Sequence, residues 1–251
     1  MTQQEPEIPL LRAAGPGALQ ELWAGHCHGL HQPDLFSAAE LAELQQALPT
    51  QLPERHAEPF PGTTFGSVLI VTPDRHRYFQ DARALRQLLE ERGLLQRLRA
   101  ALSELAGHPV QTPEEEGQPY AEVTVRRLPA GQEVAVHSER WEWPSMGWHR
   151  QQLQPRWHLS FYMPMNPLPD GGELELFHRP LKGLDLGGLS PEQARQRLGI
   201  HGHSRWSPKP GELLIFDGGR FNHRICPSSA ERWTLGGFAG RDRDGHLWIW
   251  S

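Results

Sequence analysis

The stretch WHLSFYMPMNPLPDGGELELF, residues 157–177, decides the fold class. Every second residue from Trp157 to Met163 is apolar, which is the pattern of a strand that packs one face against a hydrophobic core. The Pro-Asp-Gly-Gly segment at 169–172 is a turn signal, and ELELF begins a new strand after it. The stretch therefore predicts two neighbouring strands separated by a turn.

Short segments of the same kind continue on both sides of this stretch. Alternation begins at Tyr120, and the segments are separated by glycine, proline, aspartate or serine. They are YAEVTVRRL (120–128), EVAVHSE (133–139), PGELLIF (210–216), FNHRI (221–225), RWTLGGF (232–238) and HLWIW (246–250). Many short strands at this spacing predict a mainly β domain of jelly-roll type rather than a parallel α/β sheet.

Helical patterns precede the strands. A short helix is expected around Ala18 to Trp23, within a loop-rich segment 1–33. In DLFSAAELAELQQAL (34–48), Ser37 stands three residues before a glutamate, as in a capping box, and the following leucines share one face. Residues 73–107 predict one or two further amphipathic helices. We expect a single domain, 1–251, with loops and supporting helices over 1–117 and the jelly-roll core over 118–251.

Composition narrows the class of protein. The 251 residues carry a formal net charge of -5, which gives no electrostatic footprint for nucleic acid or an acidic membrane surface. The only two cysteines, Cys27 and Cys226, cannot build a disulfide framework. No signal peptide or membrane-length apolar run is evident. These features predict a cytoplasmic protein that binds neither nucleic acid nor membrane, and they leave its oligomeric state open.

A possible metal site lies in two of the strand segments. His137 and Glu139 are two residues apart, so a strand points both side chains the same way. His223 lies in a later strand, and two histidines with one carboxylate make the facial triad that leaves adjacent positions on iron open. Arg232 lies nine residues after His223, and Thr234 lies on the same strand face as Arg232. A guanidinium with a neighbouring hydroxyl suits a distal carboxylate.

These segments together resemble the Fe(II)/2-oxoglutarate-dependent oxygenases of the prolyl-hydroxylase-like type. The resemblance is carried, in order, by HSE, RWHLSFYMPMN, GGELELF, PKPGELLIFDGGRFNHRI and ERWTLGGF, and the helix at 34–48 also resembles the one that often opens this family. It implies a double-stranded β-helix, a jelly roll supported by helices. It also implies that Fe(II) and 2-oxoglutarate are bound and that O2 is consumed.

The resemblance also assigns roles to residues. His137, Glu139 and His223 would be the iron ligands, and Arg232 would pair with the far carboxylate of 2-oxoglutarate, assisted by Thr234. The RWHL segment is similar to the Arg-x-His strand of aspartyl/asparaginyl and free-proline hydroxylases. That similarity makes Arg156 a candidate for binding a carboxylate of the substrate or cosubstrate.

The residue at position 139 bears on the reaction. Many relatives have aspartate there and a tyrosine where this chain has Leu128, whereas the halogenases of the family lack the carboxylate and so leave room for halide. Glu139 therefore favours hydroxylation of an unactivated C–H bond, with succinate and CO2 as coproducts. We expect a small-molecule substrate, an amino acid or a natural-product intermediate, with a peptidyl side chain as the alternative. An alternative from another class is a cupin-like metal- or ligand-binding protein that is not an oxygenase, which would not require Arg232.

Two long excursions interrupt the β pattern, at 140–155 and 180–207, and such loops often act as lids or binding loops. The first contains three tryptophans among cationic residues, which fits either a substrate pocket or a packed surface loop. The second contains His201 and His203, which we interpret as solvated or substrate-facing. The GHCHGLH segment (25–31) has no paired second half with zinc-finger spacing, so we expect a loop with incidental histidines.

Overall fold

The computed structural model describes residues 12–13, 15–56, 58, 60–139, 158–180, 189–200 and 202–251. The helices are α1 (Leu19–Ala24), α2 (Ala38–Gln51), the short 3-10 helix η1 (Leu69–Val71), α3 (Arg75–Glu91), α4 (Leu94–Ala106) and α6 (Pro191–Gly199). The strands are β1 (Arg12–Ala13), β2 (Gly29–Gln32), β3 (Glu54–His56), β4 (Thr63–Phe65), β5 (Val110–Gln111), β6 (Glu114–Glu115), β7 (Gln118–Pro119), β8 (Thr124–Leu128), β9 (Val134–His137), β10 (Leu159–Pro164), β11 (Leu174–Pro180), β12 (His203–Trp206), β13 (Leu213–Phe216), β14 (Phe221–Ile225), β15 (Arg232–Arg241) and β16 (Leu247–Trp250).

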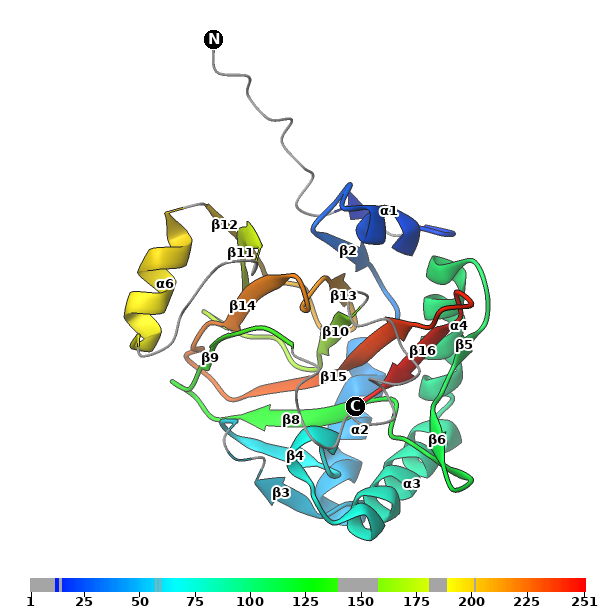
Figure 1. The fold of residues 1–251 in the computed structure, drawn as a ribbon. Coiled ribbons are helices and arrows are strands. Elements are labelled where there is room, and N and C mark those ends of the chain that lie inside the picture. Colours follow the sequence, from blue (N-terminus) through cyan, green and yellow to red (C-terminus); the bar gives the residue numbers. More distant parts are fainter. Residues whose placement is uncertain are drawn as a thin grey trace.

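The strands form two main sheets (Figure 1). The large sheet has the order β1-β2-β13-β10-β15-β8-β4-β3, with β16 and β5 attached through β15. The small sheet has the order β12-β11-β14-β9. Residues of both sheets line a common cavity, so the sheets enclose the candidate site between them. This arrangement confirms the predicted double-stranded β-helix with supporting helices.

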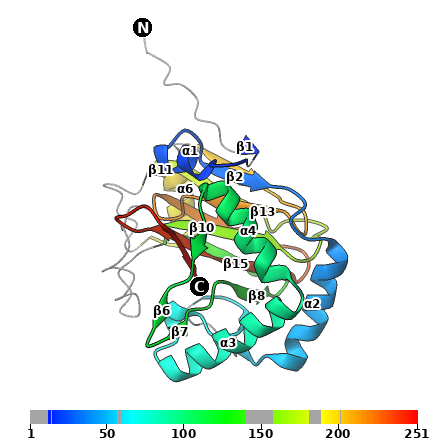
Figure 2. The same cartoon turned by 90° about the vertical axis from the view of Figure 1, so that its right-hand side faces the viewer.

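The helices cover the outer face of the large sheet. Figure 2 shows α2, α3 and α4 side by side against this layer. Their leucines form one buried core with every second residue of β10, namely Leu159, Phe161 and Met163. The alternation in the sequence therefore identified the core face of β10 correctly. Its opposite face, with Ser160 and Tyr162, is directed into the cavity.

Capping residues and a glycine set the boundaries of the helices. Ser37 and Glu40 form the predicted capping box at the start of α2. The region 73–107 contains two helices rather than one, because Gly93 adopts the left-handed φ of 65° between α3 and α4. The second excursion contains a helix, α6, and Ser190 caps it.

The expectation of only loops and helices before residue 118 was wrong. β2 extends the large sheet by pairing with β13, and the β3–β4 hairpin extends it beyond β8. The sequences of these strands are three or four residues long, too short to show a clear period. Tertiary pairing with longer strands, not local pattern, places them in the sheet.

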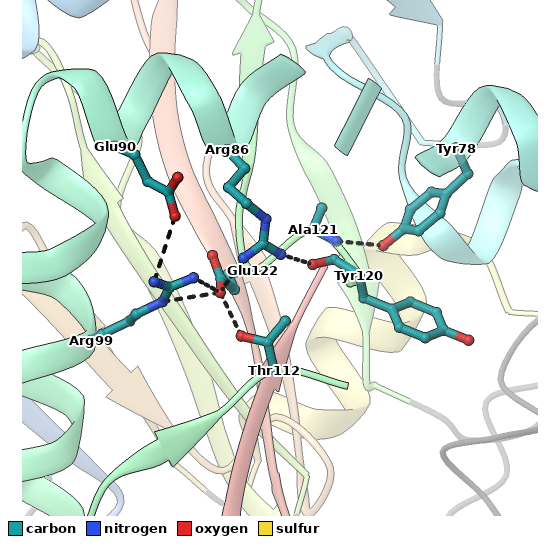
Figure 3. A network of polar contacts seen from close by, with 8 residues as sticks. All are labelled: Tyr78, Arg86, Glu90, Arg99, Thr112, Tyr120, Ala121 and Glu122. Carbon is teal, nitrogen blue, oxygen red and sulfur yellow. Dashed lines mark hydrogen bonds and ion pairs between the residues drawn. The ribbon is translucent and has the colours of Figure 1, made fainter. Parts of the chain in front are cut away.

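A buried ionic network joins the helices to the strand that leads into β8 (Figure 3). The Glu122 carboxylate is 1% exposed and accepts hydrogen bonds from Arg86 of α3, Arg99 of α4 and the Thr112 hydroxyl. Arg86 also donates to the Tyr120 carbonyl over 2.7 Å. One carboxylate thus connects two helices to the start of the mainly β half of the chain. Within the described residues, no helix is long and apolar enough to cross a membrane.

Candidate active site

Two histidines face each other across neighbouring strands of the small sheet. His137 of β9 and His223 of β14 are directly paired in the register, and their ring centroids are 4.3 Å apart. The Nδ1 atom of His137 lies 2.7 Å from the Ala135 carbonyl oxygen, and that of His223 lies 3.2 Å from the Phe221 carbonyl oxygen. A proton on Nδ1 satisfies each carbonyl, which leaves the Nε2 lone pair of each ring available to a metal.

Glu139 completes this cluster. Its backbone N–H donates to the Gly218 carbonyl over 3.0 Å, which fixes the chain just beyond β9. Its Oε1 atom lies 3.7 Å from Nε2 of His137 and 3.6 Å from Nε2 of His223. The three potential ligand atoms lie within 4.8 Å of one another. Two imidazole nitrogens and one carboxylate oxygen in this arrangement fit a non-haem Fe(II) centre with open positions.

The charges within this cluster are strongly coupled. Burial raises the pKa of Glu139, but the hydrogen bonds and charges of the two histidines outweigh burial and hold that pKa well below its usual range. Burial lowers the pKa of His137, yet its hydrogen bond to Glu139 and the charge of that carboxylate raise it overall. For His223, burial and the neighbouring His137 give a lowered pKa. The carboxylate is therefore ionised, and only one imidazole readily carries a proton.

A buried guanidinium lies in the same cavity. Arg232, on β15, is 3% exposed, and its Nε atom has no hydrogen-bond partner among the described residues. Its guanidinium carbon lies 5.4 Å from the centre of the Tyr162 ring. Burial lowers the pKa of Arg232 and raises that of Tyr162 to about 12. Thr234, two residues along β15, also lines the cavity. Such an arrangement of donors fits a carboxylate that enters between the sheets.

The comparison with known proteins agrees with this geometry. A family model described as the carrier-protein-independent halogenase WelO5 matches residues 12–251. The chain belongs to the WelO5 family. As a member, it is an Fe(II)- and 2-oxoglutarate-dependent oxygenase that uses O2. A comparison with curated proteins gave no match.

Solved structures show the same fold as this WelO5-family protein. An N-substituted L-amino acid dioxygenase from Burkholderia ambifaria AMMD is 16% identical with a TM-score of 0.62, over 93% of this chain and 90% of that one. A Pseudomonas putida prolyl-4-hydroxylase is 18% identical with a TM-score of 0.50, over 90% and 97%. The epimerase SnoN from nogalamycin biosynthesis is 16% identical with a TM-score of 0.53, over 89% and 85%.

Two cavity residues of this WelO5-family protein were not identified from its sequence. Tyr162 follows Phe161 on β10, and the alternation that assigned Phe161 to the core was the signal that its neighbour faces the cavity. Arg126 lies between Thr124 and Leu128, which both line the cavity, so it occupies the inner face of β8. The doublet Arg126-Arg127 gave no indication of which arginine points inward, because both are equally polar.

Other sequence candidates lie either outside the described residues or in contacts away from this cluster. Arg156 and the excursion 140–155 lie outside the described residues, as do 181–188 and His201. His203 pairs instead with Glu175 over 3.2 Å. In the GHCHGLH segment, His31 pairs with Glu212 over 3.1 Å, and no potential metal cluster among the described residues includes this segment.

Proposed function

We propose that this protein hydroxylates an unactivated C–H bond of a small molecule, an amino acid or a natural-product intermediate, with formation of succinate and CO2. One observation carries the choice of hydroxylation within a family named for a halogenase. The Glu139 carboxylate lies 3.6 to 3.7 Å from both imidazole Nε2 atoms, so it would bind the same metal ion and leave no place there for a halide. Fe(II) with 2-oxoglutarate and O2 supplies the oxidising chemistry when bound.

The roles of the residues follow from their positions. His137, Glu139 and His223 would bind Fe(II), with the two Nδ1 protons directed to backbone carbonyls so that each ring is fixed in orientation. Arg232 would bind the far carboxylate of 2-oxoglutarate through its guanidinium, whose Nε has no partner among the described residues. The Tyr162 hydroxyl and the Thr234 hydroxyl line the same end of the cavity and would add hydrogen bonds to that carboxylate. The apolar walls would exclude water from the reacting centre.

Two measurements in sequence test the proposal. Anaerobic titration with Fe(II) and then 2-oxoglutarate should give the visible charge-transfer band of the chelate. Succinate release should then be triggered by a member of a panel of amino acids and peptides, in buffer that contains chloride and bromide. We expect a product heavier by one oxygen. A halogenated product from the wild-type protein would contradict the assigned role of Glu139, and a peptide-only response would select the peptidyl alternative.

Glu139→Gln tests the site itself. Loss of the carboxylate charge should weaken Fe(II) binding and abolish the charge-transfer band at Fe(II) concentrations that saturate the wild type. Glu133→Gln is the matched control, because Glu133 directly precedes the same strand, β9, but its carboxylate pairs with Arg224 over 2.8 Å. The control should retain the band. Equal behaviour of the two variants would refute the ligand assignment.

A further inference from the structure

The cavity contains a second guanidinium, that of Arg126. Arg126 lies on β8 directly opposite Thr234 of β15 in the sheet register. Its neighbours two residues away, Thr124 and Leu128, line the same cavity. Arg126 and Arg232 are therefore on adjacent strands, and both belong to the inner face of the large sheet. The adjacent residue Arg127 belongs to the outer face and pairs there with Glu54.

Arg126 has no anionic partner among the described residues. Its Nη1 atom donates to the Pro61 carbonyl over 2.9 Å, and its guanidinium carbon lies 5.7 Å from the centre of the Phe60 ring. No described carboxylate forms an ion pair with it, and no described residue accepts a hydrogen bond from Nε or Nη2. Burial lowers the pKa of this group, and the charge of Glu139 opposes the effect only in part. The Nε–Nη2 edge of this half-buried side chain is thus a donor pair without an acceptor among the described residues.

The charges of the loaded site do not neutralise Arg126. A divalent cation on the His137–Glu139–His223 cluster, the Glu139 carboxylate, the 2-oxoglutarate dianion and Arg232 together sum to zero formal charge. Once the cation is bound, the Glu139 charge that attracts Arg126 is compensated by the metal. Among the described residues, one positive charge then remains in the cavity, on the half-buried Arg126, and such a charge without a partner is unfavourable. A substrate with one negative charge would balance it.

We propose that Arg126 binds a carboxylate of the substrate, so that the enzyme selects monoanionic acids with an apolar body. The free Nε–Nη2 edge is a flat pair of donors that matches the two oxygens of a carboxylate. The walls beside it are apolar and are formed by Phe60, Val68, Ile70 and Val134. This inference rests on the proposed function only in taking the cavity between the sheets as the substrate pocket.

The test compares acids with their primary amides in equilibrium binding. The protein is loaded with Mn(II) and saturating 2-oxoglutarate, so that Arg232 and the metal are occupied and no turnover occurs. Hexanoate, phenylacetate and N-acetyl-L-leucine, each beside its primary amide, are then titrated by calorimetry. We expect the wild type to bind at least one acid about 10- to 100-fold more tightly than its amide, because hydrogen bonds to a charged group are stronger than those to a neutral one.

Variants separate recognition from folding. Arg126→Met should bind acid and amide equally, and Arg126→Lys should keep only part of the preference because an ammonium lacks the planar fork. Arg127→Met is the matched control on the outer face of the same strand and should keep the full preference. The ratio of acid affinity to amide affinity is measured on the wild type alone. The inference can therefore be tested even if the Arg126→Met protein does not fold.

The inference would be overturned by no binding of any acid, by equal binding of acid and amide by the wild type, or by a preference that persists in folded Arg126→Met. The affinity for 2-oxoglutarate, measured first on the same samples, tests the proposed function separately. Intact 2-oxoglutarate binding with no acid preference removes the role of Arg126 alone. A parallel loss of 2-oxoglutarate affinity in Arg126→Met would instead assign this arginine to the cosubstrate and overturn the inference.

Discussion

Replacing Arg232 with methionine should stabilise the protein without ligands but weaken its binding of 2-oxoglutarate. The first effect concerns the protein without ligands. Arg232 is 3% exposed, and no described carboxylate forms an ion pair with it. An uncompensated buried charge costs about 3 to 5 kcal/mol, and a nearby aromatic ring such as that of Tyr162 offsets up to about 2 kcal/mol. Methionine fills a similar volume without charge. The free energy of unfolding should therefore rise by about 1 to 3 kcal/mol, or about 2 to 10 °C in Tm for a chain of this length.

The second effect concerns 2-oxoglutarate. Removing one partner of a buried, hydrogen-bonded charge pair costs about 2 to 5 kcal/mol of binding free energy. That range corresponds to an affinity about 30-fold to several thousand-fold weaker. A ligand present at about 100 times its dissociation constant stabilises the wild type by about 2.7 kcal/mol. At the same concentration, Arg232→Met should gain at most about 0.9 kcal/mol, so 2-oxoglutarate should raise its Tm by no more than about a third of the wild-type shift.

Thermal unfolding with Mn(II), in the presence and absence of 2-oxoglutarate, measures both effects in one experiment. Arg127→Met is the matched control, because this neighbouring arginine pairs with Glu54 and Glu231 on the outer face of β8. It should not raise the Tm without ligand, and it should retain the full shift with 2-oxoglutarate. If Arg232→Met lowers the stability of the unliganded protein and keeps the cosubstrate shift, Arg232 is a structural cation and the reasoning fails.

Three further predictions concern the metal centre, the buried ionic network and one turn. Because the pKa of His137 is raised above 6.5, its protonated form stabilises the metal-free protein at low pH and that contribution is lost as pH rises through the raised pKa. The affinity for Fe(II), measured by anaerobic titration, should accordingly increase about tenfold per pH unit up to that pKa and then level off; an affinity independent of pH from 6 to 8 would contradict this. Glu122→Gln should lower the free energy of unfolding in urea by about 1.5 to 3 kcal/mol without changing 2-oxoglutarate affinity, because it removes the buried charge that Arg86 and Arg99 share, while Arg86 keeps the Tyr120 carbonyl and Arg99 keeps Glu90. Gly171→Ala should lower the free energy of unfolding by about 2 kcal/mol more than Gly117→Ala in the same assay. Both glycines have positive φ, but of the two only Gly171 would place an added Cβ against a backbone carbonyl. Equal losses of stability would show that this contact relaxes.

Sequence periodicity predicted the parts of the fold in which local pattern and burial agree. The alternation in β10 separated its core face from its cavity face, and the His-x-Glu spacing on β9 placed two side chains on one side of a strand. The short strands β2, β3 and β4 could not be predicted, because three or four residues do not define a period. Their position depends on partners that are distant in the sequence.

The orientation of the Arg126-Arg127 doublet was equally beyond the sequence. Alternation requires one arginine to face inward, but it does not state which. The register with β15 settles the question, because Arg126 is opposite Thr234 and Arg127 is opposite Trp233. The inward arginine could have been inferred only by combining that register with the expectation that Thr234 faces the cavity. Pairwise strand register, rather than single-strand pattern, therefore carries the information on substrate recognition.

Membership of the family indicates the use of Fe(II), 2-oxoglutarate and O2. The residue at position 139 bears on whether the enzyme hydroxylates or halogenates its substrate. A glutamate is longer than the aspartate of many relatives by one methylene, and the structure shows how the chain makes room for it. A Cβ on Gly218 would lie 3.0 Å from Cγ of Glu139, and Gly218 also accepts the hydrogen bond from the Glu139 backbone over 3.0 Å. The glycine thus fixes the backbone of the glutamate and leaves space for its side chain. Because the carboxylate reaches both imidazoles from this position, we expect three protein ligands at the metal and the transfer of an oxygen rather than a halogen.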